Sequence, residues 1–132
     1  MDIVLSPALG GVVVGYEIGR QLAVQTIFAE RENGRLTLRR GFVIPRDSKV
    51  LIVEDVITTG KSALECAELV KKLDSKVIGY SCIIDRSNDN SLIRQKIISQ
   101  IKLKMEIFKK TDLPDKLKKI DAIKPGSRNL TK

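Results

Sequence analysis

Two adjacent carboxylates followed by a hydroxyl-rich turn form the part of this sequence best suited to chemistry. Glu54 and Asp55 directly follow the apolar run 49–53, and the next residues, 56–62, read Val-Ile-Thr-Thr-Gly-Lys-Ser. Gly60 lets the backbone approach an anion closely, and the free amides that begin a helix favour negative charge. Because carboxylates accept hydrogen bonds, the acidic pair suits a sugar diol or a hydrated magnesium ion beside that anion. We therefore predict a phosphate-binding turn with an acidic pair next to it.

Two other phosphate-binding motifs fit the sequence less well. The tripeptide 60–62 matches the end of a P-loop, but that motif needs glycine five residues before Gly60, where this chain has Asp55. The glycines at 10, 11 and 15 are spaced as GGxxxG and not as the GxGxxG of dinucleotide-binding folds. One structural alternative stays open, in which Glu54 and Asp55 only accept hydrogen bonds from their own loop.

The composition limits both the size of the fold and the kinds of catalysis. A chain of 132 residues with 42% hydrophobic residues has the length of one domain, so we expect a single domain over 1–132 with one core. The sequence has no histidine, which excludes an imidazole base or ligand. Cys66 and Cys82 are sixteen positions apart in apolar surroundings, which fits neither a disulfide framework nor a CxxC motif. We expect both thiols to be buried and reduced.

The charge distribution along the chain indicates whether nucleic acid is an expected partner. The formal net charge is +8, and residues 63–132 hold sixteen Lys and Arg against nine Asp and Glu. These cations are interleaved with aliphatic residues, whereas nucleic-acid-binding surfaces combine basic with aromatic residues. A solvated face is therefore the favoured interpretation over a nucleic-acid-binding domain. No apolar run approaches the length of a membrane span, and no signal-type segment opens the chain. We expect a cytoplasmic protein with no nucleic-acid or membrane partner.

Strand-length apolar runs alternate with helical patterns over the first 85 residues, which is typical of a parallel sheet with crossover helices. The fold class is therefore α/β. The Asn33-Gly34 dipeptide predicts a tight turn that opens a hairpin arm or flexible flap built from the runs 35–40 and 41–44. We expect Glu54-Asp55 to end a central strand, and Asp85-Arg86-Ser87-Asn88 to leave the end of the next one. The other expected elements are strands at 2–5, 24–29, 49–53, 76–84 and within 101–108, a turn at 6–11, helices reaching about 22, over 62–73 and after 112–114, and an irregular segment at 124–128.

Four motifs of the sequence resemble those of a known protein family. The stretch IVEDVITTGKS at 52–62 resembles the phosphoribosyl-pyrophosphate-binding motif of type I phosphoribosyltransferases. With the Asp-Arg pair at 85–86, LRRGF at 38–42 and KPGSR at 124–128, the whole chain resembles the orotate phosphoribosyltransferases within that family. The resemblance implies a Rossmann-like, mainly parallel sheet flanked by helices. It also implies transfer of the 5-phosphoribosyl group of phosphoribosyl pyrophosphate to orotate, giving orotidine 5'-monophosphate and pyrophosphate in UMP biosynthesis, with Mg²⁺ as cofactor.

The resemblance also assigns roles to residues of the turns. Glu54 and Asp55 would hold the ribose hydroxyls, with Asp55 also as the metal ligand. Thr58 and Arg86 would contact orotate, whose planar carboxylate suits a guanidinium; the alternative for Arg86 is a surface ion pair with Asp85. The residues that would wrap the 5'-phosphate are Val56, Ile57, Thr58, Thr59, Gly60, Lys61 and Ser62. The residues that would form the pyrophosphate loop are Ala8, Leu9, Gly10 and Gly11, for which the alternative is a plain strand-to-helix turn.

The hairpin would supply the cations that stabilise departing pyrophosphate, since such glycosyl transfer passes through an oxocarbenium-like state. The candidates are Arg31, Arg35, Arg39 and Arg40. In this family the flap closes over the site of the neighbouring subunit, so we expect a homodimer. Many members carry Arg-Lys-x-x-Lys-x-His there, whereas this chain reads Glu-Arg-Glu-Asn-Gly-Arg at 30–35, and members usually begin with a further N-terminal segment. Two alternatives are therefore kept: a truncated phosphoribosyl-pyrophosphate-binding remnant or regulatory module without catalysis, and a purine-type phosphoribosyltransferase.

Overall fold

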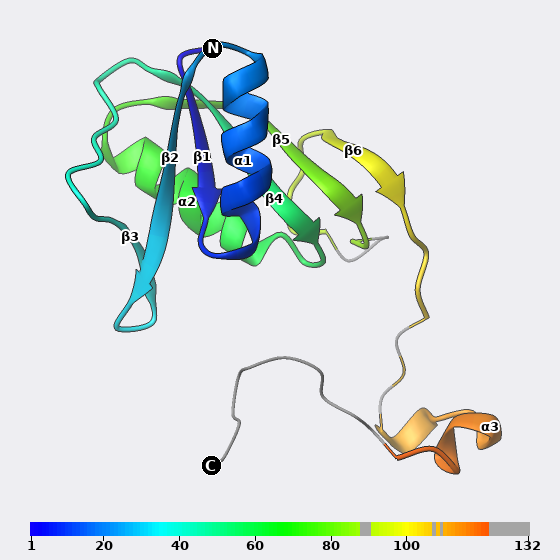
Figure 1. Cartoon of the computed structure of the whole chain (residues 1–132). Helices are drawn as coiled ribbons and strands as arrows, with labels where there is room; N and C mark the ends of the chain where they lie inside the picture. The colour runs from blue at the N-terminus through cyan, green and yellow to red at the C-terminus, as the bar shows by residue number, and fades with distance from the viewer. Residues whose placement is uncertain (88–90, 107, 109, 122–132) are drawn as a thin grey trace.

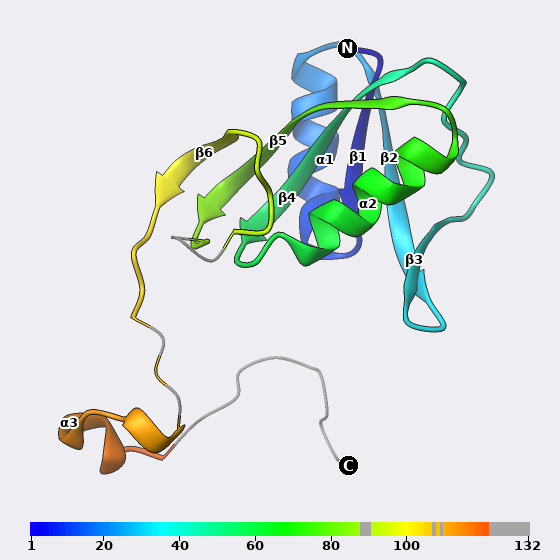
Figure 2. The same ribbon diagram turned by 180° about the vertical axis from the view of Figure 1, so that it is seen from behind.

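The computed structural model describes residues 1–87, 91–106, 108 and 110–121 and contains a six-stranded sheet with helices on both faces (Figures 1 and 2). The strand order is β3-β2-β1-β4-β5-β6, and four of the five pairings are parallel; β3 is antiparallel to β2. The expected α/β class and mainly parallel sheet are confirmed. The elements are β1 (Ile3–Pro7), α1 (Gly10–Gln21), β2 (Gln25–Glu32), β3 (Arg35–Leu38), β4 (Lys49–Ile57), α2 (Lys61–Lys72), β5 (Lys76–Asp85), β6 (Ile97–Lys102), a 3-10 turn (Lys110–Asp112) and α3 (Asp115–Lys118).

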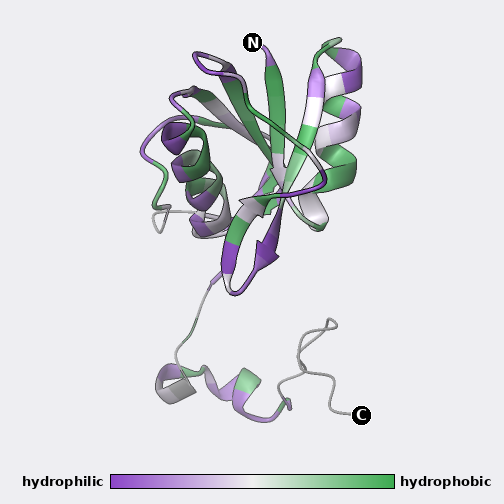
Figure 3. Cartoon of the chain, turned by 90° about the vertical axis from the view of Figure 1, so that its left-hand side faces the viewer, coloured by the Kyte–Doolittle hydropathy of each residue, from purple (hydrophilic) through white to green (hydrophobic). Residues whose placement is uncertain are grey.

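The core lies between the central strands and the two long helices. Every residue of β1 is buried, and the β4 residues Val50, Ile52 and Val53 are buried next to it, as is usual for parallel strands that are covered on both faces. Figure 3 shows hydrophobic residues along these strands and hydrophilic residues towards the end of the β2–β3 hairpin. In Figures 1 and 2 the chain leaves the sheet after β6, and α3 lies apart from it.

Helix α1 packs against the sheet through small residues. Gly11, Gly15 and Gly19 recur every four residues, so they lie on one face of the helix, and all three are buried. A Cβ on Gly15 would collide with Ser6 Oγ, and one on Gly19 would collide with Thr26 Oγ1. The missing side chains therefore let the helix approach β1 and β2 closely. This packing fixes the N-terminal end of α1 above the carboxyl end of β1.

The hairpin prediction is confirmed in its first half and wrong in its second. Asn33 (φ 48°) and Gly34 (φ 81°) form the turn, and β2 and β3 pair in the register Glu32 to Arg35. The run 41–44 forms no strand. Arg40 (φ 58°) and Gly41 (φ 74°) adopt left-handed backbone conformations, which turn the chain away from extended pairing.

Several strand boundaries differ from the sequence-based expectation, and β2 ends at Glu32 instead of at residue 29. Strand β1 extends through Pro7, which pairs with Ala29, so the turn that was expected from residue 6 starts later. Strand β4 continues past Glu54 and Asp55 to Ile57 because β5 supplies pairing partners along its whole length. The last strand, β6, starts at Ile97 and not within 101–108, because Ile97 pairs with Tyr80. The predicted short helix after 112–114 is confirmed as α3, whereas Asn88 and residues 124–128 lie outside the described residues.

Candidate phosphate and sugar site

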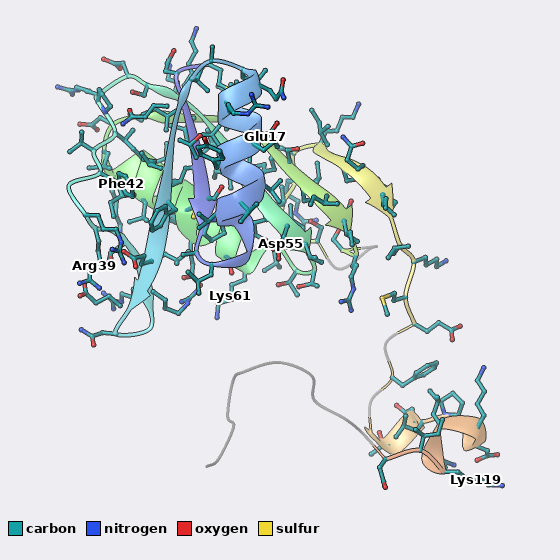
Figure 4. All side chains as sticks on the ribbon, in the orientation of Figure 1. Glu17, Arg39, Phe42, Asp55, Lys61 and Lys119 are labelled. Carbon is teal, nitrogen blue, oxygen red and sulfur yellow. The ribbon has the colours of Figure 1, made fainter. Side chains whose placement is uncertain are left out.

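Two loops at the carboxyl edge of the sheet come into contact. The first joins β1 to α1 and contains a cis peptide between Ala8 and Leu9. The second joins β4 to α2. A Cβ on Gly10 would collide with the Asp55 carboxylate, and one on Gly11 would lie 2.9 Å from the Val53 carbonyl oxygen. The structure therefore brings the predicted pyrophosphate loop against the predicted acidic pair, and Figure 4 shows Asp55 beside the N-terminal end of α1.

Glu54 has a buried carboxyl oxygen that makes no hydrogen bond to any described residue. The residue is 7% exposed, and the oxygen without a partner is Oε1. Burial, and then the charge of Asp55, raise the pKa of Glu54 to about 7. Leaving a buried polar atom unsatisfied costs on the order of 1–3 kcal/mol, so such atoms call for a structural or functional reason. A ligand hydroxyl placed at Oε1 would supply the missing hydrogen bond.

Asp55 plays a partly different role from its neighbour. Its Oδ1 accepts a hydrogen bond from the backbone N–H of Val56 at 2.8 Å, so this oxygen does serve its own loop, as the structural alternative had it. The other oxygen, Oδ2, lies over Gly10 at the contact between the two loops. The alternative therefore explains one oxygen of Asp55 and does not explain Glu54.

The turn after β4 has the features of an anion site. Gly60, which has no side chain, is the N-cap residue of α2 with φ 79°, and the first turn of the helix contains no acidic residue. The first amides of a helix have no intrahelical acceptor, and together with the helix dipole they bind anions. Thr58 and Thr59 are exposed beside them, and Thr59 Oγ1 accepts a 3.4 Å hydrogen bond from the Lys61 amide. Figure 4 shows the exposed side chain of Lys61 at this end of the helix.

The carbonyl groups of this turn are engaged elsewhere. The Gly60 carbonyl accepts from the Leu64 amide at 2.9 Å, and the Thr59 carbonyl accepts from the Leu92 amide at 2.9 Å. Ile93 packs directly against Gly60. Leu92 and Ile93 were not predicted to belong to the site. The only signal was a short apolar pair within a polar stretch, which does not reveal a contact with a turn some thirty residues away.

Arg86 lies next to the end of β4, as its predicted role requires. Its backbone N–H donates to the Ile57 carbonyl at 2.8 Å, its side chain is half-buried, and its Nε has no partner among the described residues. Asp85 interacts with other groups: Oδ1 accepts from the amide (2.9 Å) and the hydroxyl (2.6 Å) of Ser87, and Oδ2 lies 3.9 Å from Lys102 Nζ. The alternative of an Asp85–Arg86 ion pair is therefore not what the structure contains.

The hairpin arginines are largely engaged by glutamates of the chain itself. Arg31 forms an ion pair with Glu65 of α2 at 2.9 Å, and it also donates to the Gly34 carbonyl. Arg40 makes two hydrogen bonds to Glu30, at 2.8 and 2.9 Å. Arg39 lies 3.7 Å from Glu32, and Figure 4 shows Arg39 well apart from Asp55. Arg35 has no ion pair within the described ranges. The structure therefore does not bring these arginines together with the acidic pair.

The cysteines and acidic residues limit which nucleophiles and metal ligands the chain can supply. Cys66 and Cys82 are buried and free, as expected, and burial raises the pKa of their thiols to about 12 and about 11, so neither is an activated nucleophile. The described residues contain no group of three or more acidic or cysteine side chains that could hold a metal by themselves. Asp55 nevertheless fits Mg²⁺, which is commonly bound by one or two carboxylates together with substrate phosphates and water. No helix in the described part of the chain is long and apolar enough to cross a membrane.

Comparison with known proteins agrees with this geometry. Residues 1–115 match the phosphoribosyl transferase domain. The chain is 44% identical over 128 residues to the orotate phosphoribosyltransferase of Maricaulis maris, which covers 97% of this chain and 66% of the relative. It is 46% identical over 131 residues to the orotate phosphoribosyltransferase of Chlorobium phaeobacteroides, which covers 99% of this chain and 68% of the relative. The chain thus spans about two thirds of the length of these curated relatives.

A solved structure shows the same fold. The adenine phosphoribosyltransferase of Thermoanaerobacter pseudethanolicus superimposes with a TM-score of 0.67, covering 77% of this chain and 70% of that one at 20% identity. At this identity the likeness concerns the fold alone, and it confirms the expected type I phosphoribosyltransferase-like architecture. The domain match and the relatives named orotate phosphoribosyltransferase together show that the chain belongs to the phosphoribosyltransferase family, among the orotate phosphoribosyltransferases.

Proposed function

We propose that this chain transfers the 5-phosphoribosyl group of phosphoribosyl pyrophosphate to orotate, forming orotidine 5'-monophosphate and pyrophosphate in UMP biosynthesis. One observation carries the proposal: Glu54, whose buried Oε1 has no hydrogen-bond partner among the described residues, lies six positions before Gly60, the N-cap residue of α2. Together they offer an acceptor for sugar hydroxyls and donors for a phosphate. The names of the relatives support orotate as the base.

Different site residues bind different parts of phosphoribosyl pyrophosphate. The amides and hydroxyls of 58–62 hold the 5'-phosphate, and Glu54 and Asp55 accept hydrogen bonds from the ribose hydroxyls. The bond from the anomeric carbon to pyrophosphate breaks as the bond to the base nitrogen forms, so charge develops on the leaving pyrophosphate. The amides of the loop 8–11 at the N-terminal end of α1 would stabilise that charge, except for the Ala8 amide, which donates to the Ala29 carbonyl at 2.8 Å. Asp55 would hold Mg²⁺, which supplies further positive charge beside pyrophosphate.

Base recognition falls to Thr58 and Arg86. Thr58 follows β4 and Arg86 follows β5, and the Arg86 amide donates to the Ile57 carbonyl at the end of β4. Both residues therefore lie on the same edge of the sheet as the turn 58–62, which we call the phosphate turn. Arg86 makes no side-chain ion pair among the described residues, and a guanidinium suits a planar carboxylate such as that of orotate. We further propose that the protein acts in the cytoplasm as a homodimer, with Arg35 as the hairpin cation most available to pyrophosphate.

The direct test is incubation of the purified chain with phosphoribosyl pyrophosphate, orotate and Mg²⁺. We expect orotate absorbance to fall while pyrophosphate appears in equal amount. Adenine and hypoxanthine, offered in place of orotate and as competitors, separate this activity from a purine-specific transferase. A flat trace from well-folded protein would defeat the proposal.

The structure favours one second candidate. Arg31, Arg39 and Arg40 are held by glutamates, which would suit a regulatory module that binds phosphoribosyl pyrophosphate without turning it over. Calorimetric binding of phosphoribosyl pyrophosphate together with absent turnover would identify that module. Binding together with turnover would exclude it.

A further inference from the structure

A short turn outside every recognised motif, residues 91–93, contacts the phosphate turn at two points. The Leu92 amide donates to the Thr59 carbonyl at 2.9 Å. The Ile93 side chain lies so close to Gly60 that a Cβ on this glycine would be 2.7 Å from Ile93 Cγ1 and Cδ1. Figure 2 shows the segment that leads into β6 passing beside the N-terminal end of α2.

The 91–93 turn is itself well fixed. Ser91 Oγ accepts from the Ile93 amide at 3.1 Å and donates to the Ile93 carbonyl at 3.2 Å, which closes the turn. Ile93 is 5% exposed and belongs to the hydrophobic core. The two contacts with the phosphate turn are therefore made by an anchored segment, and they restrain the residues that they touch.

The hydrogen bond from Leu92 determines which way one peptide group faces. In a trans peptide the carbonyl and the N–H point in opposite directions. Because the Thr59 carbonyl is held by Leu92, the Gly60 N–H of the same peptide points away from the 91–93 turn. If that peptide rotated, a carbonyl oxygen would replace an N–H at the anion site and repel the phosphate.

We propose that the 91–93 turn is a positioning element of the phosphate site, in which the Leu92 amide and the Ile93 side chain hold the Thr59–Gly60 peptide with its N–H available to the 5'-phosphate. This inference rests on the proposed function and deepens it. Neither residue is placed in contact with the substrate, so both act through the phosphate turn. They are therefore positioning residues and not catalytic ones.

The decisive variant is Ile93→Ala, which opens a void beside Gly60 and lets the turn adopt other conformations. The apparent dissociation constant of phosphoribosyl pyrophosphate is inversely proportional to the fraction of molecules whose phosphate turn is in the binding conformation. If that fraction falls to about one-tenth, the substrate binds about tenfold more weakly. The 5'-phosphate is held equally in the ground state and the transition state. We therefore expect KM for phosphoribosyl pyrophosphate to rise about tenfold, with kcat and the KM for orotate nearly unchanged.

Ile3→Ala is the matched control. Ile3 is 2% exposed and lies in the same core, but it is at the opposite end of β1 from the site. We expect it to lower stability without changing the KM for phosphoribosyl pyrophosphate. If either alanine variant fails to fold, Ile93→Val and Ile3→Val replace them, and the change in KM should then be smaller but still confined to position 93. An equal rise in KM for both positions, or none at position 93, overturns the inference.

A double-mutant cycle tests the contact itself. Gly60→Ala introduces both a positive-φ penalty and a collision with Ile93, whereas in the Ile93→Ala background only the penalty remains. We expect Gly60→Ala to weaken phosphoribosyl pyrophosphate binding less in that background than in the unaltered chain. Equal losses in the two backgrounds would show that the Ile93 contact does not restrain Gly60.

Amide hydrogen exchange separates this inference from the proposed function. Without substrate, the Leu92 amide should be protected in the unaltered chain, and Ile93→Ala should speed its exchange at least tenfold more than Ile3→Ala does. Unchanged protection overturns the positioning role whether or not the chain turns over phosphoribosyl pyrophosphate. If the unaltered chain shows no turnover but its Leu92 amide is protected from exchange as expected, the result would count against the proposed activity alone.

Discussion

The phosphate turn and the β2–β3 hairpin differ in whether their ligand-binding groups are already hydrogen-bonded within the chain. In the turn, the carbonyls of Thr59 and Gly60 are bonded within the chain, while Glu54 Oε1 has no partner among the described residues. In the hairpin, Arg31 and Arg40 are bonded to glutamates. The turn would therefore meet a ligand by giving up at most the 3.4 Å hydrogen bond from the Lys61 amide to Thr59 Oγ1, whereas these arginines must exchange a carboxylate for it. The comparison predicts that most of the affinity comes from the turn and that the hairpin contributes by changing partners.

The largest expected effect comes from the acidic pair. Asp55→Asn removes the charge while keeping the size of the side chain, and we expect kcat/KM for phosphoribosyl pyrophosphate to fall about a hundredfold, since hydrogen bonds to charged groups are the stronger ones. Lys61→Ala should change it less than about threefold, because the Lys61 side chain is exposed and the backbone of the turn, unchanged in this variant, supplies the anion donors. Steady-state kinetics on both variants decide, and equal losses would contradict the ranking.

An effect of similar size concerns stability. The pKa of Glu54 is raised to about 7, above its ordinary value of 4.5, so the folded state binds a proton that the unfolded state releases between those values. The resulting stabilisation is complete below pH 4.5 and is lost as the pH rises through about 7. From the size of the shift, we expect the substrate-free chain to lose about 3 kcal/mol of unfolding free energy over that range.

Urea unfolding from pH 4.5 to 8, without divalent cations, measures this loss. Glu54→Gln is the control, because it keeps the shape but removes the titration. Subtracting its pH profile from that of the unaltered chain cancels the contributions of Glu17 and Glu30, whose carboxyl pKa values are lowered by hydrogen bonds from Arg20 and Arg40. A flat difference between the two profiles would show that Glu54 ionises normally.

The parts of this comparison differ in how far the sequence predicts them. The turn was predicted because its chemistry is local: a buried run, two acids and a hydroxyl-rich turn are contiguous. The Asn33-Gly34 turn was predicted for the same reason. The extent of β4 beyond Glu54 was not, because pairing with β5 determines it. The contact from Leu92 to Thr59 uses backbone atoms alone, so no residue type signals it.

The arginine partners were likewise beyond reach of the sequence. Alternating Arg and Glu along the hairpin is compatible with solvated charges, with pairs inside the hairpin and with a pair to another element. The structure has two of these arrangements at once, since Arg40 pairs with Glu30 inside the hairpin and Arg31 pairs with Glu65 on α2. Choosing between them requires the packing of the hairpin against α2, which is a property of the whole fold.

The smallest expected effect tests the hairpin side of the comparison. Arg35 has no ion pair within the described ranges, whereas Arg40 is bonded twice to Glu30 and lies 5.9 Å over the Phe28 ring. An exposed cation contributes little to binding, and one that must first leave a carboxylate contributes less. We therefore expect Arg35→Ala to raise the KM for phosphoribosyl pyrophosphate about threefold, and Arg40→Ala to raise it less than about twofold.

Glu30→Gln sharpens this test because it releases Arg40 without altering Arg35. If partner exchange limits Arg40, the Glu30→Gln background should make Arg40→Ala as costly as Arg35→Ala, since both cations are then free. The differences should shrink when the salt concentration rises from about 0.05 M to about 0.5 M, because exposed charges are screened. A larger loss from Arg40→Ala than from Arg35→Ala in the unaltered chain would mean that the Arg40–Glu30 pair opens without cost, and the contrast between the turn and the hairpin would not hold.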